Sequence, residues 1–303
     1  MNLIFKLKNA KKVLNLAAHE SNLLVELDEA GTRAIHAALL EIYHDIRRAC
    51  EKHGIPVILC GGSALGAVRH HGFIPWDDDM DLSMSRRDYE RFCGIFEQEL
   101  GEKYLLNAPN YCRNAKNRYP RVLKKDSCFE NIIDVKDESL HKLFVDIFII
   151  DNVPDNPVHR FLKGRACEAL HFIAGQVYVY ECRDADMKKY FLAVGRSYYY
   201  ARMLIGFLFS FRKSSRWFDS IDRLSRHDNE KSAFVGAVTG RWHYFGELIE
   251  RDTCFPYSTG TFEGEEVLLH HRVDRYLTKM YGDYAKLPPP EDRERHFIYR
   301  MKL

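Results

Sequence analysis

The stretch LCGGSALGAVRHHGFIPWDDDMDLSM, residues 59–84, combines a double glycine, a short helical pattern and a run of aspartates. It overlaps a short apolar run, residues 55–60, that predicts a buried strand. The turn Gly61-Gly62-Ser63 follows, with Ser63 at the expected N-cap of a helix. Glycines at such a turn let backbone N–H groups approach a phosphate. We therefore expect a phosphate-binding turn, with a purely structural turn as the alternative.

The aspartates of this stretch follow a period of two. Asp77, Asp79 and Asp81 alternate with apolar residues, which is the spacing of a strand over 77–84. Carboxylates at this spacing share one face and repel each other unless a cation lies between them. Oxygen-only ligands favour Mg²⁺, with Mn²⁺ as the alternative. We expect a metal site here, with Asp78 facing solvent. The alternative without a metal is an exposed acidic strand end.

Another carboxylate lies far along the chain. Asp146 interrupts LFVDIFII, residues 143–150, which otherwise has the pattern of a buried strand. A buried carboxylate needs a partner, and a metal, an acceptor hydroxyl or a structural arginine would serve. Arg69, Arg121 and Lys124 are candidates to neutralise a bound phosphate, and solvated surface cations are the alternative.

Composition and charge narrow the class of protein. The chain has 303 residues and a net charge of +2 with mixed signs along it, which by itself is uninformative about nucleic acid, and we do not expect nucleic acid as a partner. Its eight cysteines form no CxxC pair and predict reduced thiols in a cytosolic protein. The N-terminus lacks the apolar segment of a signal peptide. The longest apolar stretch, residues 203–211, predicts a buried helix, with peripheral contact at a membrane interface as the alternative.

The remaining patterns predict an α/β (α+β) fold, a mixed sheet core flanked by helices with a mostly helical C-terminal half. Helices are expected over 27–53 and 86–100, with Ser85 as the N-cap of the second. A last helix is expected over 266–280, before a proline run at 288–290 that closes the ordered part. The predicted division is a helical extension at 1–26, a catalytic core at 27–156 and a mostly helical region at 157–303 that completes the site.

The stretch over residues 61–84, continued by DYERF at 88–92, closely resembles the LicD/fukutin family, a phosphotransferase branch of the polymerase-β-like nucleotidyltransferase superfamily. VDIF at 145–148 with Asp151, and FEG at 262–264, resemble later signatures of that family, as do YGDY at 281–284 and the LPP that follows it. The resemblance runs from about residue 27 to residue 296, and the first string is highly specific. Residues 157–251 carry no assigned motif.

The resemblance implies a nucleotidyltransferase-like core and a Mg²⁺-dependent transfer of a phospho-alcohol from a CDP-activated donor, releasing CMP. The donor favoured is CDP-choline, and the acceptor is a hydroxyl of a cell-surface glycan or lipid-linked glycan such as lipopolysaccharide, capsule or teichoic acid. Asp79 and Asp81 would then hold the metal with Asp77, and Asp146 would act as a ligand or general base. Gly62 and Ser63 would hold the donor phosphates. A cytoplasmic location is implied, with the inner face of the membrane as the alternative.

Two other functions fit the same residues. The acids would equally serve a true nucleotidyltransferase that uses a nucleoside triphosphate, and a non-catalytic scaffold in glycan assembly is the second alternative. The gap between Ser63 and Asp79 is longer than in the usual nucleotidyltransferase, so the superfamily role of Ser63 transfers less directly. Aromatic residues between 178 and 211 would line a choline pocket or, as the ordinary alternative, form core.

Overall fold

The computed structural model describes residues 27–131, 138–183, 188, 191–192, 195–289, 293 and 298–303. The predicted extension at 1–26 lies outside this part of the chain. The helices are α3 (Glu29–Lys52), α4 (Gly61–His70), α5 (Arg86–Leu100), η1 (Glu138–Leu140), α6 (Pro157–Glu181), α8 (Arg196–Phe209), α9 (Ser214–Ser225), α10 (His243–Gly246), α11 (Arg251–Cys254) and α12 (Val273–Tyr281). The strands are β1 (Ile58–Leu59), β2 (Asp81–Ser85), β3 (Tyr104–Asn107), β4 (Arg121–Lys124), β5 (Cys128–Asn131), β6 (Phe144–Val153), β7 (Phe234–Gly236), β8 (Leu248–Glu250), β9 (Ser258–Phe262), β10 (Glu265–Leu269) and β11 (Ile298–Lys302).

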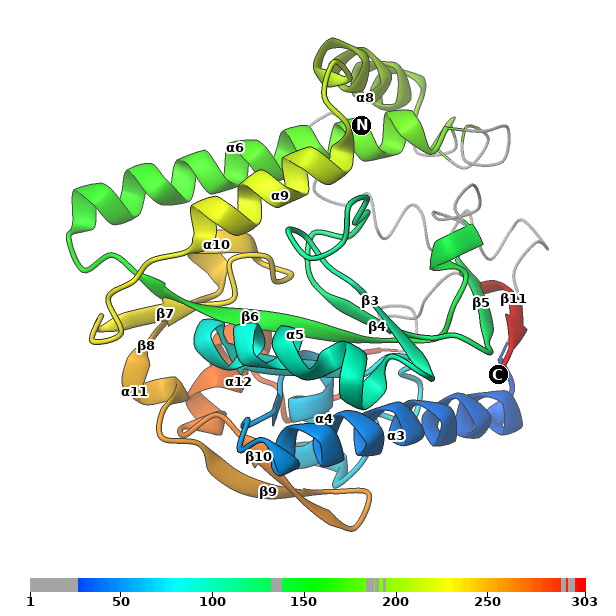
Figure 1. Ribbon diagram of the computed structural model, residues 1–303, viewed down its shortest axis with the longest axis vertical. Coiled ribbons are helices and arrows are strands. Elements are labelled where there is room, and N and C mark those ends of the chain that lie inside the picture. The colour runs from blue at the N-terminus through cyan, green and yellow to red at the C-terminus, as the bar shows by residue number, and fades with distance from the viewer. Residues whose placement is uncertain are drawn as a thin grey trace.

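One mixed sheet of nine strands organises the described residues. Its order is β3-β4-β6-β2-β1-β10-β9, with β7 paired to β6 and β8 to β7. The central pair β2 and β6 is parallel, whereas β4 runs antiparallel to β6. In Figure 1, α6, α8 and α9 lie above the long strand β6, while α3, α4, α5 and α12 lie below it. The predicted α/β class, a mixed sheet flanked by helices, is confirmed.

The sheet joins the two halves of the chain. Strands β7 to β10 come from the predicted C-terminal region, and β10 pairs in parallel with β1 through Leu268 and Ile58. The prediction of one helix over 266–280 is wrong, because the first part of that segment is strand β10. Alternate side chains of β10, Val267 and Leu269, are buried, and its backbone pairs with both β9 and β1. The proline run is not the end of regular structure either, since β11 follows it and pairs with β5.

Two of the helices that pack below the sheet, α3 and α5, begin and end close to where their sequences predict. Ser85 is the N-cap of α5, and its hydroxyl accepts a hydrogen bond from the Asp88 N–H. The predicted helix over 27–53 is α3, which is capped by Asp28 and ends at Lys52. Its buried residues Ile35, Leu39, Ile42 and Ile46 follow the helical period and enter the main core. These caps and apolar faces place α3 and α5 against β6.

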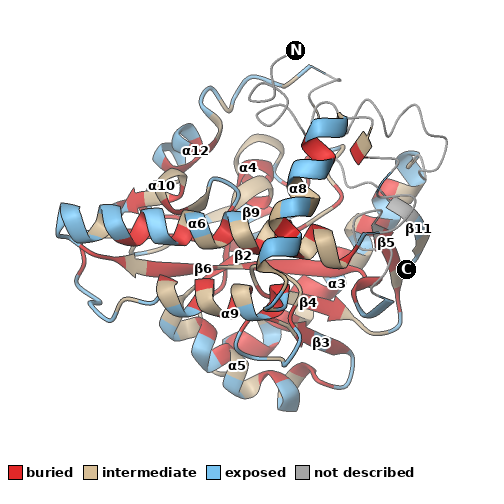
Figure 2. Cartoon of the chain, turned by 90° about the horizontal axis from the view of Figure 1, so that it is seen from above, coloured by how far each residue is buried: buried red, intermediate tan, exposed pale blue. Residues whose placement is uncertain are grey.

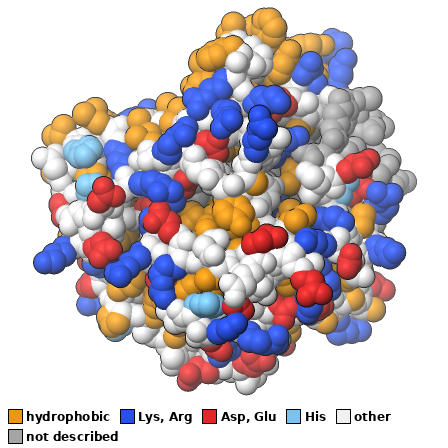
Figure 3. All heavy atoms as spheres, viewed as in Figure 1, with side chains coloured by type: hydrophobic (Ala, Val, Ile, Leu, Met, Phe, Trp, Pro, Cys, Tyr) orange, Lys and Arg blue, Asp and Glu red, His pale blue; other side chains and the backbone are white. Residues whose placement is uncertain are grey.

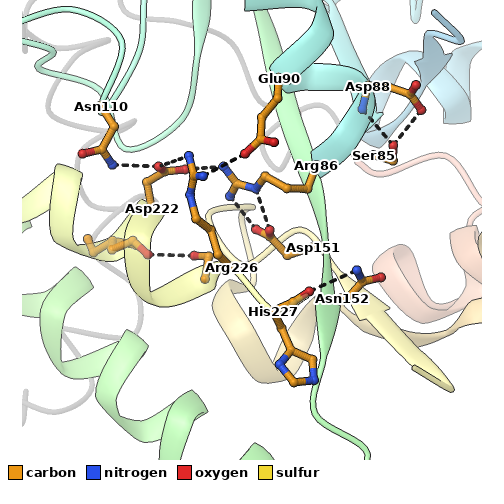
Figure 4. A network of polar contacts seen from close by, with 12 residues as sticks. Ser85, Arg86, Asp88, Glu90, Asn110, Asp151, Asn152, Asp222, Arg226 and His227 are labelled. Carbon is orange, nitrogen blue, oxygen red and sulfur yellow. Dashed lines mark hydrogen bonds and ion pairs between the residues drawn. The ribbon is translucent and has the colours of Figure 1, made fainter. Parts of the chain in front are cut away.

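A buried ion network ties α5 and β6 to α9 (Figure 4). The Arg86 guanidinium donates to both carboxylate oxygens of Asp151, at 2.8 and 2.9 Å, and to Asp222 at 2.6 Å. The side chain of Asn110 donates to the other oxygen of Asp222 at 2.7 Å. Asp151 and Asp222 are 2% and 5% exposed, so Arg86 is the cation that makes their burial tolerable.

Helix α8 does not lie in the core. The predicted buried helix over 203–211 is wrong, because Leu204, Phe207, Leu208 and Phe211 are all more than half exposed. Figure 2 shows the corresponding exposed segments along α8. Among the described residues, no helix combines the length and the apolarity needed to cross a bilayer.

Candidate active site

Three neighbouring strands place two acids and a cation side by side. Asp81 begins β2 and is opposite Asp146 of β6, which in turn is opposite Arg121 of β4. The Arg121 guanidinium donates to the Asp146 carboxylate at 2.7 Å. Asp146 is 3% exposed, and this ion pair supplies the partner that its burial requires. We expected Asp146 and Asp81 in one site, and the parallel register of β2 and β6 brings them together.

The other aspartates gather in front of this strand end. Strand β2 begins only at Asp81, so Asp77 and Asp79 lie in the loop before it and the strand predicted from residue 77 is too long. The prediction that Asp78 faces solvent is wrong, since that residue is 3% exposed. The pKa of Asp77 is raised well above its usual value by burial and by the nearby charges of Asp79, Asp78 and Asp81. The loop before β2 therefore brings the aspartates together, as the predicted strand was expected to do.

The double glycine is required by this acidic cluster. Gly61 has a φ of +51°, and a Cβ on it would lie 2.4 Å from the Asp81 carboxylate. A Cβ on Gly62 would lie 2.8 Å from the Asp77 carboxylate. The Gly62 N–H donates to Asp81 at 3.2 Å, and the Gly61 N–H donates to the Tyr276 hydroxyl at 3.0 Å. These N–H groups, which we expected to hold phosphate, already have partners in the protein.

Ser63 holds the strand rather than capping the helix. Helix α4 begins at Gly61 and its N-cap is Cys60, so the N-cap prediction for Ser63 is wrong. The Ser63 hydroxyl instead accepts a hydrogen bond from the Asp81 N–H at 2.9 Å, and Ser63 is buried. Ser63 therefore fixes the backbone from which the Asp81 carboxylate projects.

The aspartates line a large cavity of about 770 Å³. This volume is within the range of sites that enclose small molecules and cofactors. The acidic lining residues are Asp77, Asp78, Asp79, Asp81, Asp146, Glu247 and Asp283, and the basic ones are Arg69, Arg118, Arg241, Lys286 and Arg293. The aromatic rings in the lining are Trp76, Tyr119, Phe148, Trp242, Tyr276, Tyr281 and Tyr284. The cavity thus offers cations for an anionic group close to a carboxylate cluster and several aromatic faces.

Of the three predicted cations, Arg69 lines the cavity, whereas Arg121 and Lys124 do not. Arg69 lines the cavity and donates to the backbone carbonyl of Tyr284 at 2.8 Å. Lys124 is not in the lining, because it pairs with Glu41 of α3 at 2.7 Å. The described aromatic residues between 178 and 211 are also absent from the lining, so the choline pocket proposed for that segment is not there. Aromatic side chains from other parts of the chain take that place.

Two cavity residues that were not predicted from the sequence, Glu247 and His270, lie in the C-terminal half of the chain. Glu247 is 8% exposed and its carboxylate accepts a hydrogen bond from the Trp242 N–H at 3.0 Å. Burial raises the pKa of this carboxyl. His270 stacks on Tyr276 with ring centroids 3.8 Å apart, and burial lowers its pKa to about 3, so its ring is neutral. A single acid or histidine without a motif gives no signal in one sequence.

The donor set of the acidic cluster suits a small divalent cation. Among the described residues, no three His, Cys, Asp or Glu side chains form a ready-made metal site. Mg²⁺ needs fewer protein ligands, since it is bound by one or two carboxylates together with water and substrate phosphates. Asp77 and Asp79 are within hydrogen-bonding distance of each other, and the charge of Asp81 acts on Asp77 as well. A crowded set of carboxylates in a cavity that also has cations for a phosphate fits such an ion.

A mixed sheet with a carboxylate cluster in a cavity is the arrangement of an enzyme site, and comparisons with known proteins specify its class. A family model described as "LicD/FKTN/FKRP, nucleotidyltransferase domain" matches residues 54–162. The lipopolysaccharide cholinephosphotransferase LicD of Haemophilus influenzae is 30% identical over 274 residues, which cover 86% of this chain and 92% of that protein. An uncharacterized protein of Rickettsia prowazekii is 36% identical over 158 residues, or 51% of this chain and 53% of that protein.

The chain therefore belongs to the LicD family. It is an enzyme, a phosphotransferase of the LicD type. The matched region contains the double glycine, all four clustered aspartates and Asp146, so the resemblance expected from residues 61–84 is confirmed.

Proposed function

We propose that this enzyme transfers phosphocholine from CDP-choline to a hydroxyl of a glycan, releasing CMP in a Mg²⁺-dependent reaction. The observation that carries the proposal is the cavity in which the aspartate cluster, five cations and seven aromatic rings meet. The similar protein of Haemophilus influenzae is named for transfer of phosphocholine to lipopolysaccharide, which supports the alcohol and the acceptor class. Phosphate would occupy the cationic part of the cavity, and the aromatic faces suit a quaternary ammonium group.

Arginines of the cavity wall are the proposed partners of the donor diphosphate. Arg118 and Arg241 come from loops beside β4 and β7, and Arg69 comes from the last turn of α4. They replace Lys124 among the proposed donor-binding residues, while Arg121 acts on Asp146. Trp76 lies in the same lining, with the Arg293 guanidinium 4.2 Å from its ring centroid. This distribution puts the cations and the acids in one space where a diphosphate can bridge them.

The proposed reaction is an in-line displacement at the β-phosphorus. An acceptor hydroxyl forms the new P–O bond, the bond to the bridging oxygen breaks, and CMP leaves with its electron pair. A bound Mg²⁺ would neutralise charge on the phosphate oxygens, and Asp79 and Asp81, with Asp77, would hold it. Ser63 and Gly62 position Asp81 through their hydrogen bonds. Arg121 holds Asp146 in place at the neighbouring strand.

The proton of the acceptor hydroxyl passes to Glu247 in this proposal. Asp146 is already held in an ion pair with Arg121 at the strand end. Among the described residues, Glu247 has no such cation bonded to it in the cavity wall, and burial raises its pKa, which brings it nearer the working pH of a general base. Glu247 also lines the cavity, so substrate can reach it.

Glu247→Gln should lower kcat about 100-fold, the usual size of a general-base contribution. The wild-type rate should rise as the pH rises through the raised pKa of Glu247, because only the ionised carboxylate accepts a proton. In Glu247→Gln this limb of the profile should be flat. Glu250→Gln, which changes an exposed glutamate three residues away, is the matched control. An unchanged pH profile in Glu247→Gln contradicts the role of this residue.

A donor panel tests the proposed function directly. Purified enzyme, Mg²⁺ and a glycan acceptor are incubated with CDP-choline, CDP-ribitol or CTP, each carrying label in the part to be transferred. The proposal predicts label transfer from CDP-choline and release of CMP. Incorporation of nucleotide from CTP would establish the nucleotidyltransferase alternative instead. Absence of transfer and of binding with every donor, in the presence of Mg²⁺, would favour a scaffold.

A further inference from the structure

Helix α8 has an apolar face that points away from the protein. Tyr200, Leu204, Phe207 and Leu208 are spaced by four, three and one residues, which puts them on one side of α8, and Phe211 follows in the turn just beyond the helix. Their exposed fractions run from 54% to 79%. A soluble helix normally turns such a stripe inward. In Figure 3 hydrophobic side chains gather at the top of the molecule, over α8.

The opposite side of α8 is firmly packed, so this exposure is not a loosely attached helix. Gly206 approaches α6 so closely that a Cβ on it would lie 2.5 Å from the Gln176 carbonyl oxygen. The Arg202 guanidinium donates to the Gln176 side chain at 2.6 Å, and Tyr198 and Tyr199 are buried. The exposed stripe is therefore held in a fixed direction by α6.

Helix α6 adds a second apolar group on its own exposed side. Val158, Phe161, Leu162 and Phe172 are each more than half exposed. Their spacing of three, one and ten residues again fits one side of a helix. Hydrophobic side chains also appear along the upper edge of the molecule in Figure 3, where α6 runs. The two helices thus present apolar side chains on the upper part of the molecule.

Cations predominate in the sequence that contains α8, and the nearest described acids, Glu181 and Asp219, contact Ser214 and Arg216. Between residues 187 and 218 the sequence contains Lys188, Lys189, Arg196, Arg202, Arg212, Lys213 and Arg216 and no Asp or Glu. Arg196 at the start of α8 and Lys213, the N-cap of α9 just beyond it, are exposed and have no carboxylate partner among the described residues. A second copy of this chain would bring the same excess of cations to a twofold interface. An anionic bilayer complements both the apolar stripe and the cations.

We infer that α8, supported by α6, is a docking face for the surface of an anionic phospholipid bilayer. The helix would lie in the interface plane with its stripe among the acyl chains and with Arg196 and Lys213 at the headgroups. The inference is independent of which donor the enzyme uses. It also assigns a use to the aromatic-rich segment that does not reach the cavity.

Vesicle flotation of the full chain tests this assignment. Wild-type protein should bind vesicles containing roughly one third phosphatidylglycerol at least about tenfold more than pure phosphatidylcholine vesicles. Raising salt from about 0.1 M to about 0.5 M should weaken that binding. Leu204→Ser combined with Leu208→Ser should reduce the bound fraction at least about tenfold. Leu105→Ser, at an exposed leucine of β3, should leave it unchanged.

A charge reversal provides an independent readout that does not depend on apolar packing. Lys213→Glu should reduce binding to the anionic vesicles, whereas Lys302→Glu, at an exposed lysine of β11, should not. Equal binding by wild type and the double serine variant overturns the inference, as does failure of wild type to bind anionic vesicles. A concentration-dependent dimer that the double serine variant abolishes would assign the face to a second copy and overturn it too.

Discussion

Asp79→Asn and Asp81→Asn should each reduce phosphocholine transfer by at least about 1,000-fold, which corresponds to about 4 kcal/mol of lost transition-state stabilisation. Both carboxylates lie in the cavity beside Asp77, whose pKa is raised by burial and by the neighbouring negative charges. Asparagine keeps the size of the side chain but removes the charge that would hold a divalent cation. Initial rates with CDP-choline and a glycan acceptor measure the effect.

The thermal stability of these variants should not fall with their activity. Removing one of several carboxylates that repel each other relieves an unfavourable interaction, so Tm should stay equal or rise. Mg²⁺ should raise the Tm of the wild type, since a ligand that binds only the folded state stabilises it, and this rise should shrink in Asp79→Asn. Asp252→Asn changes an exposed aspartate in surface ion pairs of α11 and is the control for activity. Near wild-type turnover in Asp79→Asn would remove this residue from the metal site.

The acidic half of the site is predictable because its signals are local. The double glycine, the closely spaced aspartates and the cap at Ser85 lie within about one supersecondary unit, and each has a short-range physical cause. The meeting of Asp81 with Asp146 needs only two adjacent parallel strands, which an apolar run with one acid already indicates. Strand β2 begins later than predicted, but the predicted site is little affected, because the loop before β2 places the same carboxylates in the cavity.

The rest of the cavity depends on contacts between distant residues. Glu247, Arg241 and His270 reach the site only because β7 to β10 join the sheet beyond β6 and β1. The segment over 266–280 has enough apolar residues for a helix, but its first part forms a strand because it pairs with β1. Likewise, the apolar stripe of α8 predicted burial, since sequence periodicity shows that a face exists but not what covers it.

Arg86→Met should lower the free energy of unfolding by about 3–5 kcal/mol at pH 7, the cost of breaking a buried ion pair by removing one partner. The substitution leaves the carboxylates of Asp151 and Asp222 facing the same buried space (Figure 4). Arg226 lies 3.5 Å from Asp222, whereas among the described residues the hydrogen bonds to the Asp151 carboxylate come from Arg86. Urea unfolding measures the loss.

Arg87→Met is a matched control on the same helix. Arg87 is exposed and lies 3.9 Å from an exposed glutamate, so its loss should cost less than about 1 kcal/mol. A similar loss of stability in the two variants would show that Arg86 contributes through its position on α5 and not through its buried partners. Adding Asp151→Leu to Arg86→Met should recover part of the loss, because it removes one uncompensated charge.

The pH dependence of Arg86→Met distinguishes buried charge from lost packing. Burial already raises the pKa of Asp151, while Arg86 lowers it, so removing the arginine should raise this pKa further. A carboxyl with a raised pKa in the folded state binds a proton that the unfolded state has released. Stability is then lost as pH rises towards the folded pKa, and the deficit of Arg86→Met should be smaller at about pH 5 than at about pH 8. A deficit that is the same at both values would mean that packing of the Arg86 side chain, rather than its charge, holds α5 and α9 to β6.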